Sequence, residues 1–484
     1  MRPRRMRQRL LTLDTGLGER HASWLELFFD LVFVLAVSQL AQMLAKNSDP
    51  VGFLKFAALF IPVWWSWVGF TFFADRFESE ETVYRILMFI GMLTVAAFSL
   101  SVDGAFSGTG DAAFVICYAL VRLVIVALYA RSAYNVPVAR VLSVQYLTGF
   151  SIAILILLAS LLFEPPVRYY IWAAVFALEL ITPFVNLKAT SAIPYDQSHI
   201  PERFGLFTII VLGEAVIATA NGASAVQWSI GTVLTASIGF GMAACIWWIN
   251  FDFVDDNAIR SRNWLPRISY LYGNFFIVGS IVALGIGVEH AINETSDAHL
   301  HFPTLALIGG GIAAFLAAIT IIKLAAGVRR LFFSRIAAIG VSLSLIYLGG
   351  FLPPLAVVGA YFFVLVAGVW FEDSEAAAAS ATKTSALIPC EHSELATVFE
   401  PNTKDGCEEC VKNHYKWVHL RLCLECGHVG CCDSSRYKHA TAHYHETEHA
   451  IIASMEEDEN WAWCYTDGRF VPLAKPVGIL PSKN

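Results

Sequence analysis

The last quarter of the chain carries cysteines and histidines at spacings that suit a metal ion. Two Cys-x2-Cys pairs each bring two thiolates within reach of one ion, and His439 and His443 are one helical turn apart. Such pairs mixed with histidines favour metal binding over a disulfide framework. We therefore expect zinc ligands among Cys390, His392, Cys407, Cys410, Cys423, Cys426, Cys431 or Cys432, His439, His443, His449 and Cys464.

Further features of the sequence limit which chemistry the cysteines and histidines can perform. Cys117 and Cys245 stand alone in apolar runs, where a thiol is a small buried hydrophobe, and the eight clustered cysteines predict a reducing compartment. A catalytic zinc needs an open coordination position and a nearby base. The candidate ligands fill the sites and no separate Cys/His arrangement is evident, so we expect structural zinc and not an enzyme. The acidic stretch "SMEEDEN" argues against nucleic-acid binding.

Most of the chain before this tail has the composition of a membrane protein. Of 484 residues 56% are hydrophobic and only 15% are charged, against about 25% in an ordinary soluble domain. Long apolar runs such as 27–44 and 149–163 recur along the chain, and segments of about 20 apolar residues span a bilayer. The sequence predicts an all-α polytopic membrane protein of about twelve helices, near 24–45, 51–74, 84–102, 111–130, 139–163, 167–187, 203–222, 227–251, 268–292, 302–326, 331–350 and 353–371.

The positive charges predict the orientation of these helices. A basic arm, 1–23, precedes the first helix, and alternate loops carry cations such as Arg76, Arg131 and Arg140. Cytoplasmic loops are enriched in Lys and Arg. We expect a multi-pass protein of the cell membrane with both termini in the cytoplasm. The small, polar segment 372–387 is expected to be a linker to a small α+β zinc-binding domain at 388–484.

A weak internal similarity divides the membrane part into halves. The stretch "VWWSWVGFTFFADR" at 63–76 is similar to "IWWINFDFVDDN" at 246–257, and 25–36 is loosely similar to 201–214. Two six-helix repeats explain this pattern. The alternative is that the paired tryptophans are only interfacial anchors.

Ionisable residues inside the predicted spans are candidates for a pathway. Charged groups in a membrane are costly and face a cavity or a partner. Glu26 and Asp30 share one face of the first helix, and Glu214 lies deep in an apolar helix. Acidic groups outnumber basic ones, which favours handling of a small cation or a proton. The alternative is helix-packing ion pairs, with Arg122 as counter-ion to Glu179, Glu214 or Asp30.

Two long motifs resemble a known family. The stretches "RHASWLELFFDLVFV" at 20–34 and "HIPERFGLFTIIVLGEAVI" at 199–217 look like the low temperature requirement protein A family of bacterial membrane proteins. The resemblance covers roughly 20–371. It implies that Glu26, Asp30, His199, Glu202, Arg203 and Glu214 are motif positions of the family. The membrane pathway candidates are these residues without Arg203.

The tail resembles the zinc finger of ubiquitin-specific proteases over 388–475. The resemblance implies up to three interleaved zinc sites. The family's second late Cys-x2-Cys is absent, and Asp467 is the candidate that completes the third site. The implied sets are Cys407, Cys410, His439 and Cys431 (preferred to Cys432); Cys423, Cys426, His443 and His449; and Cys390, His392, Cys464 and Asp467.

The same resemblance implies a ligand, the free carboxyl terminus of a ubiquitin-like protein. Trp463 and Tyr465 match the aromatic pocket of the family, whose carboxylate-binding arginine is missing at its usual place, and Arg436 is the candidate substitute. The alternative is that these aromatic residues are core of a small domain. The sequence thus favours a channel or transporter with a regulatory tail that holds two to three zinc ions. The competing hypothesis is a membrane scaffold that recruits a partner through its zinc finger.

Overall fold

The computed structural model describes residues 22–77, 79, 81–185, 196, 199–253, 264–385, 390–456, 459 and 461–471. Almost all of the predicted basic arm, 1–23, lies outside these residues. The chain divides into two compact units, Met1–Glu372 and Asp373–Asn484. We describe each unit by itself.

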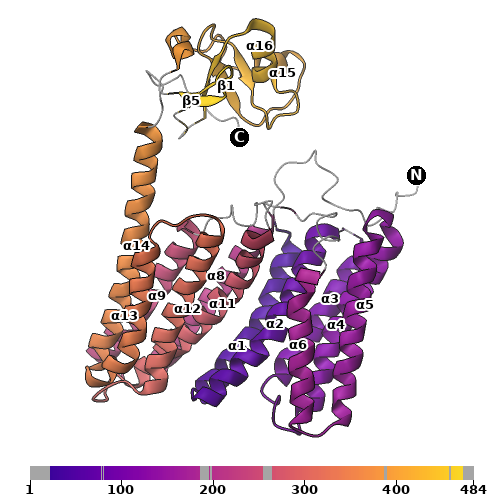
Figure 1. Ribbon diagram of the computed structural model, residues 1–484, viewed down its shortest axis with the longest axis vertical. Coiled ribbons are helices and arrows are strands. Elements are labelled where there is room, and N and C mark those ends of the chain that lie inside the picture. Colours follow the sequence, from indigo (N-terminus) through magenta and orange to yellow (C-terminus); the bar gives the residue numbers. More distant parts are fainter. Residues whose placement is uncertain are drawn as a thin grey trace. The chain divides into compact units, whose positions relative to one another are not determined.

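The first unit is a bundle of long helices, as the hydropathy predicted (Figure 1). Eleven helical segments of the described chain are long and apolar enough to cross a membrane. The remaining long helix, α6, carries Arg168 and Glu179, and with it the prediction of about twelve spans is confirmed. The helices are α1 Trp24–Lys46, α2 Pro50–Phe77, α3 Thr82–Ser101, α4 Asp111–Asn135, α5 Arg140–Ala159, α6 Val167–Val185, α8 His199–Ala225, α9 Ile230–Phe253, α11 Trp264–Asn293, α12 Phe302–Ala325, α13 Phe332–Leu348 and α14 Pro354–Ser385.

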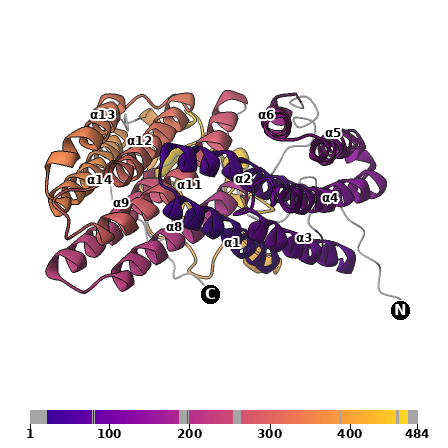
Figure 2. The same cartoon turned by 90° about the horizontal axis from the view of Figure 1, so that it is seen from below.

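The helices pack in the same order in two halves. In α1–α6 the first helix contacts the second and third, the third contacts the fourth, and the fourth contacts the fifth; the corresponding contacts recur in α8–α14. This arrangement agrees with two six-helix halves, which meet where α1 and α2 pack on α8 and α11 (Figure 2). The paired tryptophans are not equivalent, because Trp64 is buried whereas Trp247 and Trp248 are exposed.

Aromatic rings fill the junction between the halves. Trp67 of α2 stacks on Phe207 of α8 with ring centroids 4.4 Å apart and meets Phe204 edge-on at 4.9 Å. Trp64 lies edge-on to the same two phenylalanines. Large buried rings in such geometries contribute strongly to packing. They fix how α2 sits against α8 and therefore position the polar groups at the ends of these helices.

The segment 372–387, predicted to be a linker, is helical as far as Ser385, because α14 continues beyond the apolar part of the chain. Its alanine-rich composition favours helix. The boundary between the compact units falls between Glu372 and Asp373, at the start of this segment. Glu372 is buried, and its carboxylate pairs with Lys323 of α12 and Arg335 of α13 at 2.6 and 2.7 Å, so the α14 helix is held to the bundle at this point.

The second unit is a small α+β domain, as predicted. Its five-stranded antiparallel sheet has the order β2-β1-β3-β4-β5, and the residues of β2 and β3 are buried throughout. The helix α16, which carries two candidate histidines, packs on β2 and β1. The elements are η5 Glu391–Leu395, α15 Glu408–Lys412, β1 Leu420–Cys423, β2 Val429–Cys431, α16 His439–Thr447, β3 Ile451–Ser454, β4 Ala462–Cys464 and β5 Arg469–Val471.

Candidate metal centres and a buried charge cluster

The first ligand set joins α15, β2 and α16. The thiols of Cys407, Cys410 and Cys431 lie 3.2, 3.3 and 3.4 Å from Nδ1 of His439, and Cys410 and Cys431 are 3.9 Å apart. Tetrahedral zinc with bonds of about 2.3 Å to sulfur and 2.05 Å to nitrogen places S and N about 3.6 Å apart and two sulfurs about 3.8 Å apart. The four side chains therefore fit one zinc ion.

The thiol chemistry of this set also suits a cation. The pKa of Cys431 falls to about 5, mainly because the Cys407 thiol donates a hydrogen bond to it, although burial opposes the shift. A thiolate is therefore present at neutral pH, and the thiolate is the form that binds metal.

The second ligand set joins the end of β1 and the turn that follows it to α16 and to His449, which lies between α16 and β3. Nε2 of His443 lies 3.3 Å from the Cys426 thiol and 3.3 Å from Nδ1 of His449, and that nitrogen is 3.6 Å from the Cys423 thiol. Two nitrogens bound to tetrahedral zinc are about 3.4 Å apart. Burial raises the pKa of Cys423 to about 12, so zinc binding displaces its proton.

The third ligand set joins the start of the domain to the turn between β4 and β5. Cys390, His392, Cys464 and Asp467 offer four ligand atoms that all lie within 4.8 Å of one another. Nδ1 of His392 is 3.4 Å from Oδ2 of Asp467, the separation expected for two ligands of one tetrahedral ion. The structure thus brings together all three implied sets, with Asp467 in the place left open by the missing cysteine.

The choice between Cys431 and Cys432 follows from the strand. Successive side chains of a strand point to opposite sides. Cys431, the last residue of β2, faces His439, whereas the thiol of Cys432 lies 3.7 Å from Nδ1 of His419 and 3.5 Å from Oγ of Ser435. Cys431 is therefore the ligand that belongs to the first set.

Two residues that sequence reasoning missed connect the first and second sets. Oε1 of Glu409 is 2.7 Å from Nε2 of His428, whose ring stacks on the ligand His443 with centroids 4.1 Å apart. The other oxygen of Glu409 is 3.4 Å from the Cys407 thiol. Partners of this kind orient metal ligands and tune the ion. No spacing pattern identifies them, because they lie between the ligands without belonging to a motif.

The three candidate pocket residues make different contacts. Trp463 of β4 packs edge-on against Phe470, on the sheet face where Arg421 covers the ring of Trp461 at 4.7 Å. Arg436 instead lies over the neighbouring ring of Tyr437.

Tyr465 lies beyond the end of β4 and faces α16. Its ring stacks on Tyr444, and its hydroxyl is 3.0 Å from Oγ1 of Thr441. Thr441 also donates a hydrogen bond to Asp433 at 2.6 Å, so an acid stands near Tyr465. Arg421, which the sequence did not single out, is the cation on the aromatic face of the sheet.

The membrane unit contains a buried charge cluster at the end of the bundle where α1 and α8 begin. Arg203 of α8 pairs with Glu26 at 2.7 Å and donates a hydrogen bond to Asp30 at 2.6 Å. These three side chains are at most 1% exposed. Asp30 also accepts a hydrogen bond from the indole of Trp67 at 2.8 Å. The predicted carboxylates of α1 are thus held by both halves of the bundle.

A histidine extends this cluster to α2. Nδ1 of His199 is 2.9 Å from Asp75, and Nε2 is 3.3 Å from Glu26. Glu26 also caps α1, since its carboxylate accepts from the amide of Ser23 at 2.8 Å. Asp75 was not singled out in the sequence because it lies next to Arg76 at the end of an apolar helix. Such a charged pair is the usual end of a membrane span. Arg76 itself is not a loop cation: it lies within α2 and is buried.

The other candidate pathway residues lie apart from the cluster core. Glu202 is half-buried and accepts a hydrogen bond from the amide of Ala22 at 3.3 Å. In the described chain no hydrogen bond or ion pair joins Glu214 to another group, and the carboxylate near it is Glu289 of α11. Arg122 pairs with Glu179 at 2.6 Å, which confines that arginine to a separate buried ion pair in the first half.

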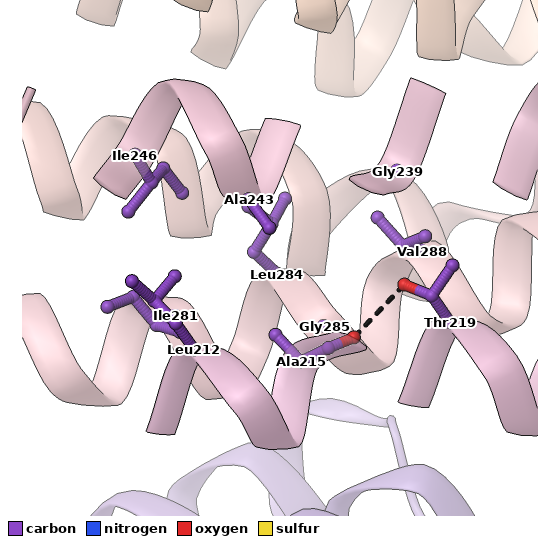
Figure 3. A pocket seen from close by; sticks show the side chains of 10 residues that line it. All are labelled: Leu212, Ala215, Thr219, Gly239, Ala243, Ile246, Ile281, Leu284, Gly285 and Val288. Carbon is purple, nitrogen blue, oxygen red and sulfur yellow. Dashed lines mark hydrogen bonds between the residues drawn. The ribbon is translucent and has the colours of Figure 1, made fainter. Parts of the chain in front are cut away.

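The interface between α8, α9 and α11 holds a small apolar cavity (Figure 3). Its volume is about 10 Å³, at the lower limit of what one water needs. The hydroxyl of Thr219, its polar group, already donates to the carbonyl of Ala215 at 3.0 Å. Glu214 is not among the residues that line it. This cavity is a packing gap and offers no ligands to a cation.

The fold and its sites define a multi-pass helical membrane protein with a metal-binding Cys/His domain. The family model described as bacterial low temperature requirement A protein matches residues 21–370, and the chain belongs to this family. A second model, the zinc finger in ubiquitin-hydrolases and other proteins, matches 407–475. This range contains nearly all of the motifs at 20–34 and 199–217, which supply every residue of the charge cluster except Asp75.

Individual relatives add little about activity. An uncharacterized protein of Rhizobium meliloti (strain 1021), RA0937, is 27% identical over 332 residues, which cover 62% of this chain and 80% of that protein. The solution structure of protein RPA1320 from Rhodopseudomonas palustris is 42% identical over 19% of this chain and 96% of its own, with a TM-score of 0.17.

Proposed function

We propose that this protein moves a small cation or a proton across the cell membrane, with the buried charge cluster as its binding site. The observation that supports this proposal is the position of the cluster. Glu26, Asp30, Asp75 and His199 come from α1, α2 and α8, and they lie at the junction of two six-helix halves. Membrane transporters built from repeats bind their substrates at such junctions.

The cost of the cluster argues for a role beyond packing. Ionisable side chains within spans are rare because their burial is costly, and such groups mark ion or proton pathways. One oxygen of Asp30, Oδ2, is buried and has no hydrogen-bond partner in the described structure. A cation or a proton bound at Asp30 satisfies this oxygen, and motion between the halves would then expose the site.

The zinc finger is proposed to lie in the cytoplasm, as are both termini. Three zinc ions fit the three ligand sets, and the metal supplies the fixed geometry that a small domain needs to fold. The half-exposed face around Trp463 and Phe470, with Arg421 beside it, is proposed to bind the carboxyl terminus of a glycine-ended protein. A titration of the full chain with a Gly-Gly peptide and its amidated form tests this, because only the free carboxylate should bind.

The alternative is a scaffold that does not transport. It is favoured by the pairing of Arg203 with both α1 carboxylates, which is also what a purely structural ion pair requires. In that case the zinc finger carries the function and the cluster only holds the two halves together.

Flux measurements in liposomes separate these functions. We expect wild-type protein to conduct potassium, sodium or protons, and Asp30→Asn to lower the rate at least tenfold at equal reconstitution. Glu164→Gln, which changes an exposed acid in a loop, is the matched control and should keep the wild-type rate. Glu214→Gln tests the second candidate carboxylate. Absence of flux for all three ions in the wild type would refute transport of these ions and favour the scaffold.

A further inference from the structure

The third ligand set differs in chemistry from the other two. The first has three thiols and one imidazole, and the second has two of each, whereas the third replaces one soft ligand with the carboxylate of Asp467. Zinc is held best by thiolate and imidazole, and a carboxylate belongs to harder, weaker sites. The composition of this set therefore predicts a lower affinity for zinc.

Two ligands of this set, His392 and Asp467, are also accessible to solvent. The side chains of His392 and Asp467 are 33% and 29% exposed, although Cys390 and Cys464 are buried. In the first set all three cysteines are buried. Water and a competing chelator can therefore reach the third ion from one side.

The guanidinium of Arg469 competes with zinc for the Oδ2 oxygen of Asp467. Arg469 of β5 pairs with Oδ2 of Asp467 at 3.2 Å, the atom that lies 3.4 Å from His392. When zinc takes this oxygen, the guanidinium must give up part of its interaction. Because the arginine is 44% exposed, the competition is modest in size but acts on this set alone.

The ligands of this set come from segments that are distant in the sequence. Cys390 and His392 begin the domain directly after α14 and the short segment that follows it, whereas Cys464 and Asp467 flank the turn between β4 and β5. The next backbone anchor of the first segment is at Thr397 and Val398, whose amides both donate to the carbonyl of Leu424. A metal ion here closes residues 390–396 onto the β4–β5 turn.

We propose that the third set is an exchangeable zinc site, which fastens the segment leaving the membrane helix to the β4–β5 turn while the other two ions stay bound. This proposal rests on the proposed zinc binding by the finger. It makes the closure of residues 390–396 onto the β4–β5 turn responsive to the concentration of free zinc.

Zinc release from the full-length protein in detergent tests the proposal. After loading, metal content is measured by elemental analysis, and release into excess pyridylazoresorcinol is followed by absorbance. We expect three zinc ions per chain, one of which leaves at least about tenfold faster than the others. Asp467→Cys should abolish the fast phase and retain three ions, and Arg469→Gln should slow that phase by up to about fivefold.

A control variant should behave as the wild type does, and each contrary result refutes a different proposal. Asp405→Asn changes an exposed acid outside all three sets and should release zinc as the wild type does. Release of three ions in one phase, or a content of two ions, would overturn the exchangeable site and leave zinc binding intact. A zinc-free protein would overturn the proposed zinc binding itself.

Hydrogen exchange provides a readout that does not depend on metal content. Partial removal of zinc, to two ions per chain, should raise amide exchange in residues 390–396 and leave β1 and β3 protected. Asp467→Cys should keep 390–396 protected under the same treatment. Exchange that rises equally in the segment and in the sheet would show that the third ion is part of one cooperative unit, contrary to the proposal.

Discussion

Replacement of Arg203 by methionine tests the energetic role of the charge cluster most directly. Methionine keeps much of the apolar stem, so the change removes the guanidinium with little loss of packing. Glu26 and Asp30 then lose a cation whose nitrogens lie 2.7 and 2.6 Å from their oxygens, in a site that is 1% exposed. Removing one partner of a buried ion pair costs about 3–5 kcal/mol. We expect the free energy of unfolding of Arg203→Met to fall by that amount.

Unfolding in mixed detergent and SDS micelles, followed by tryptophan fluorescence, measures this change. Trp64 and Trp67 pack beside the cluster and report the loss of its structure. Arg85→Met removes an exposed arginine and should change the free energy by less than about 0.5 kcal/mol. An equally small change for Arg203→Met would refute the argument that this arginine holds the two halves together.

A double-mutant cycle with Asp30→Asn isolates the pair. Asparagine keeps the size of the side chain and its hydrogen bond from Trp67. We expect the double variant to be less destabilised than the sum of the single ones, with a coupling of about 1–3 kcal/mol. Additive effects would mean that Arg203 and Asp30 act independently despite their contact.

Two further predictions concern the zinc set and the helix packing. Cys431→Ser should lose one zinc ion per chain by elemental analysis, whereas Cys432→Ser should keep all of them; the reverse result would reassign the ligand. Gly285→Ala places a methyl group 2.9 Å from Cα of Ala215, where backbone must shift, and should lower the free energy of unfolding by about 1–3 kcal/mol. Gly340→Ala, with nothing within 4 Å, is the control and should be neutral or stabilising by up to about 1 kcal/mol.

The elements and the ligand types can be predicted from local features of the chain. Long apolar runs must form helices in a bilayer, because backbone polar groups there have no water to bond to. The spacing of the Cys-x2-Cys pairs and of His439 and His443 follows from local geometry, since each pair meets one ion within a turn. Such elements can be predicted from the sequence because they are formed by residues that are close together along the chain.

Only the tertiary structure decided which distant groups meet. Asp75 lies 124 residues from His199 in sequence, and no periodicity relates them, yet the packing of α2 on α8 places their side chains 2.9 Å apart. The packing of α8 likewise leaves Glu214 beside Glu289 of α11 and apart from the carboxylates of α1. In the zinc domain, the position of α16 against β2 selected Cys431 over Cys432, because alternate strand residues face opposite sides. Long-range contacts depend on how whole elements pack, and a single sequence records the elements but not their arrangement.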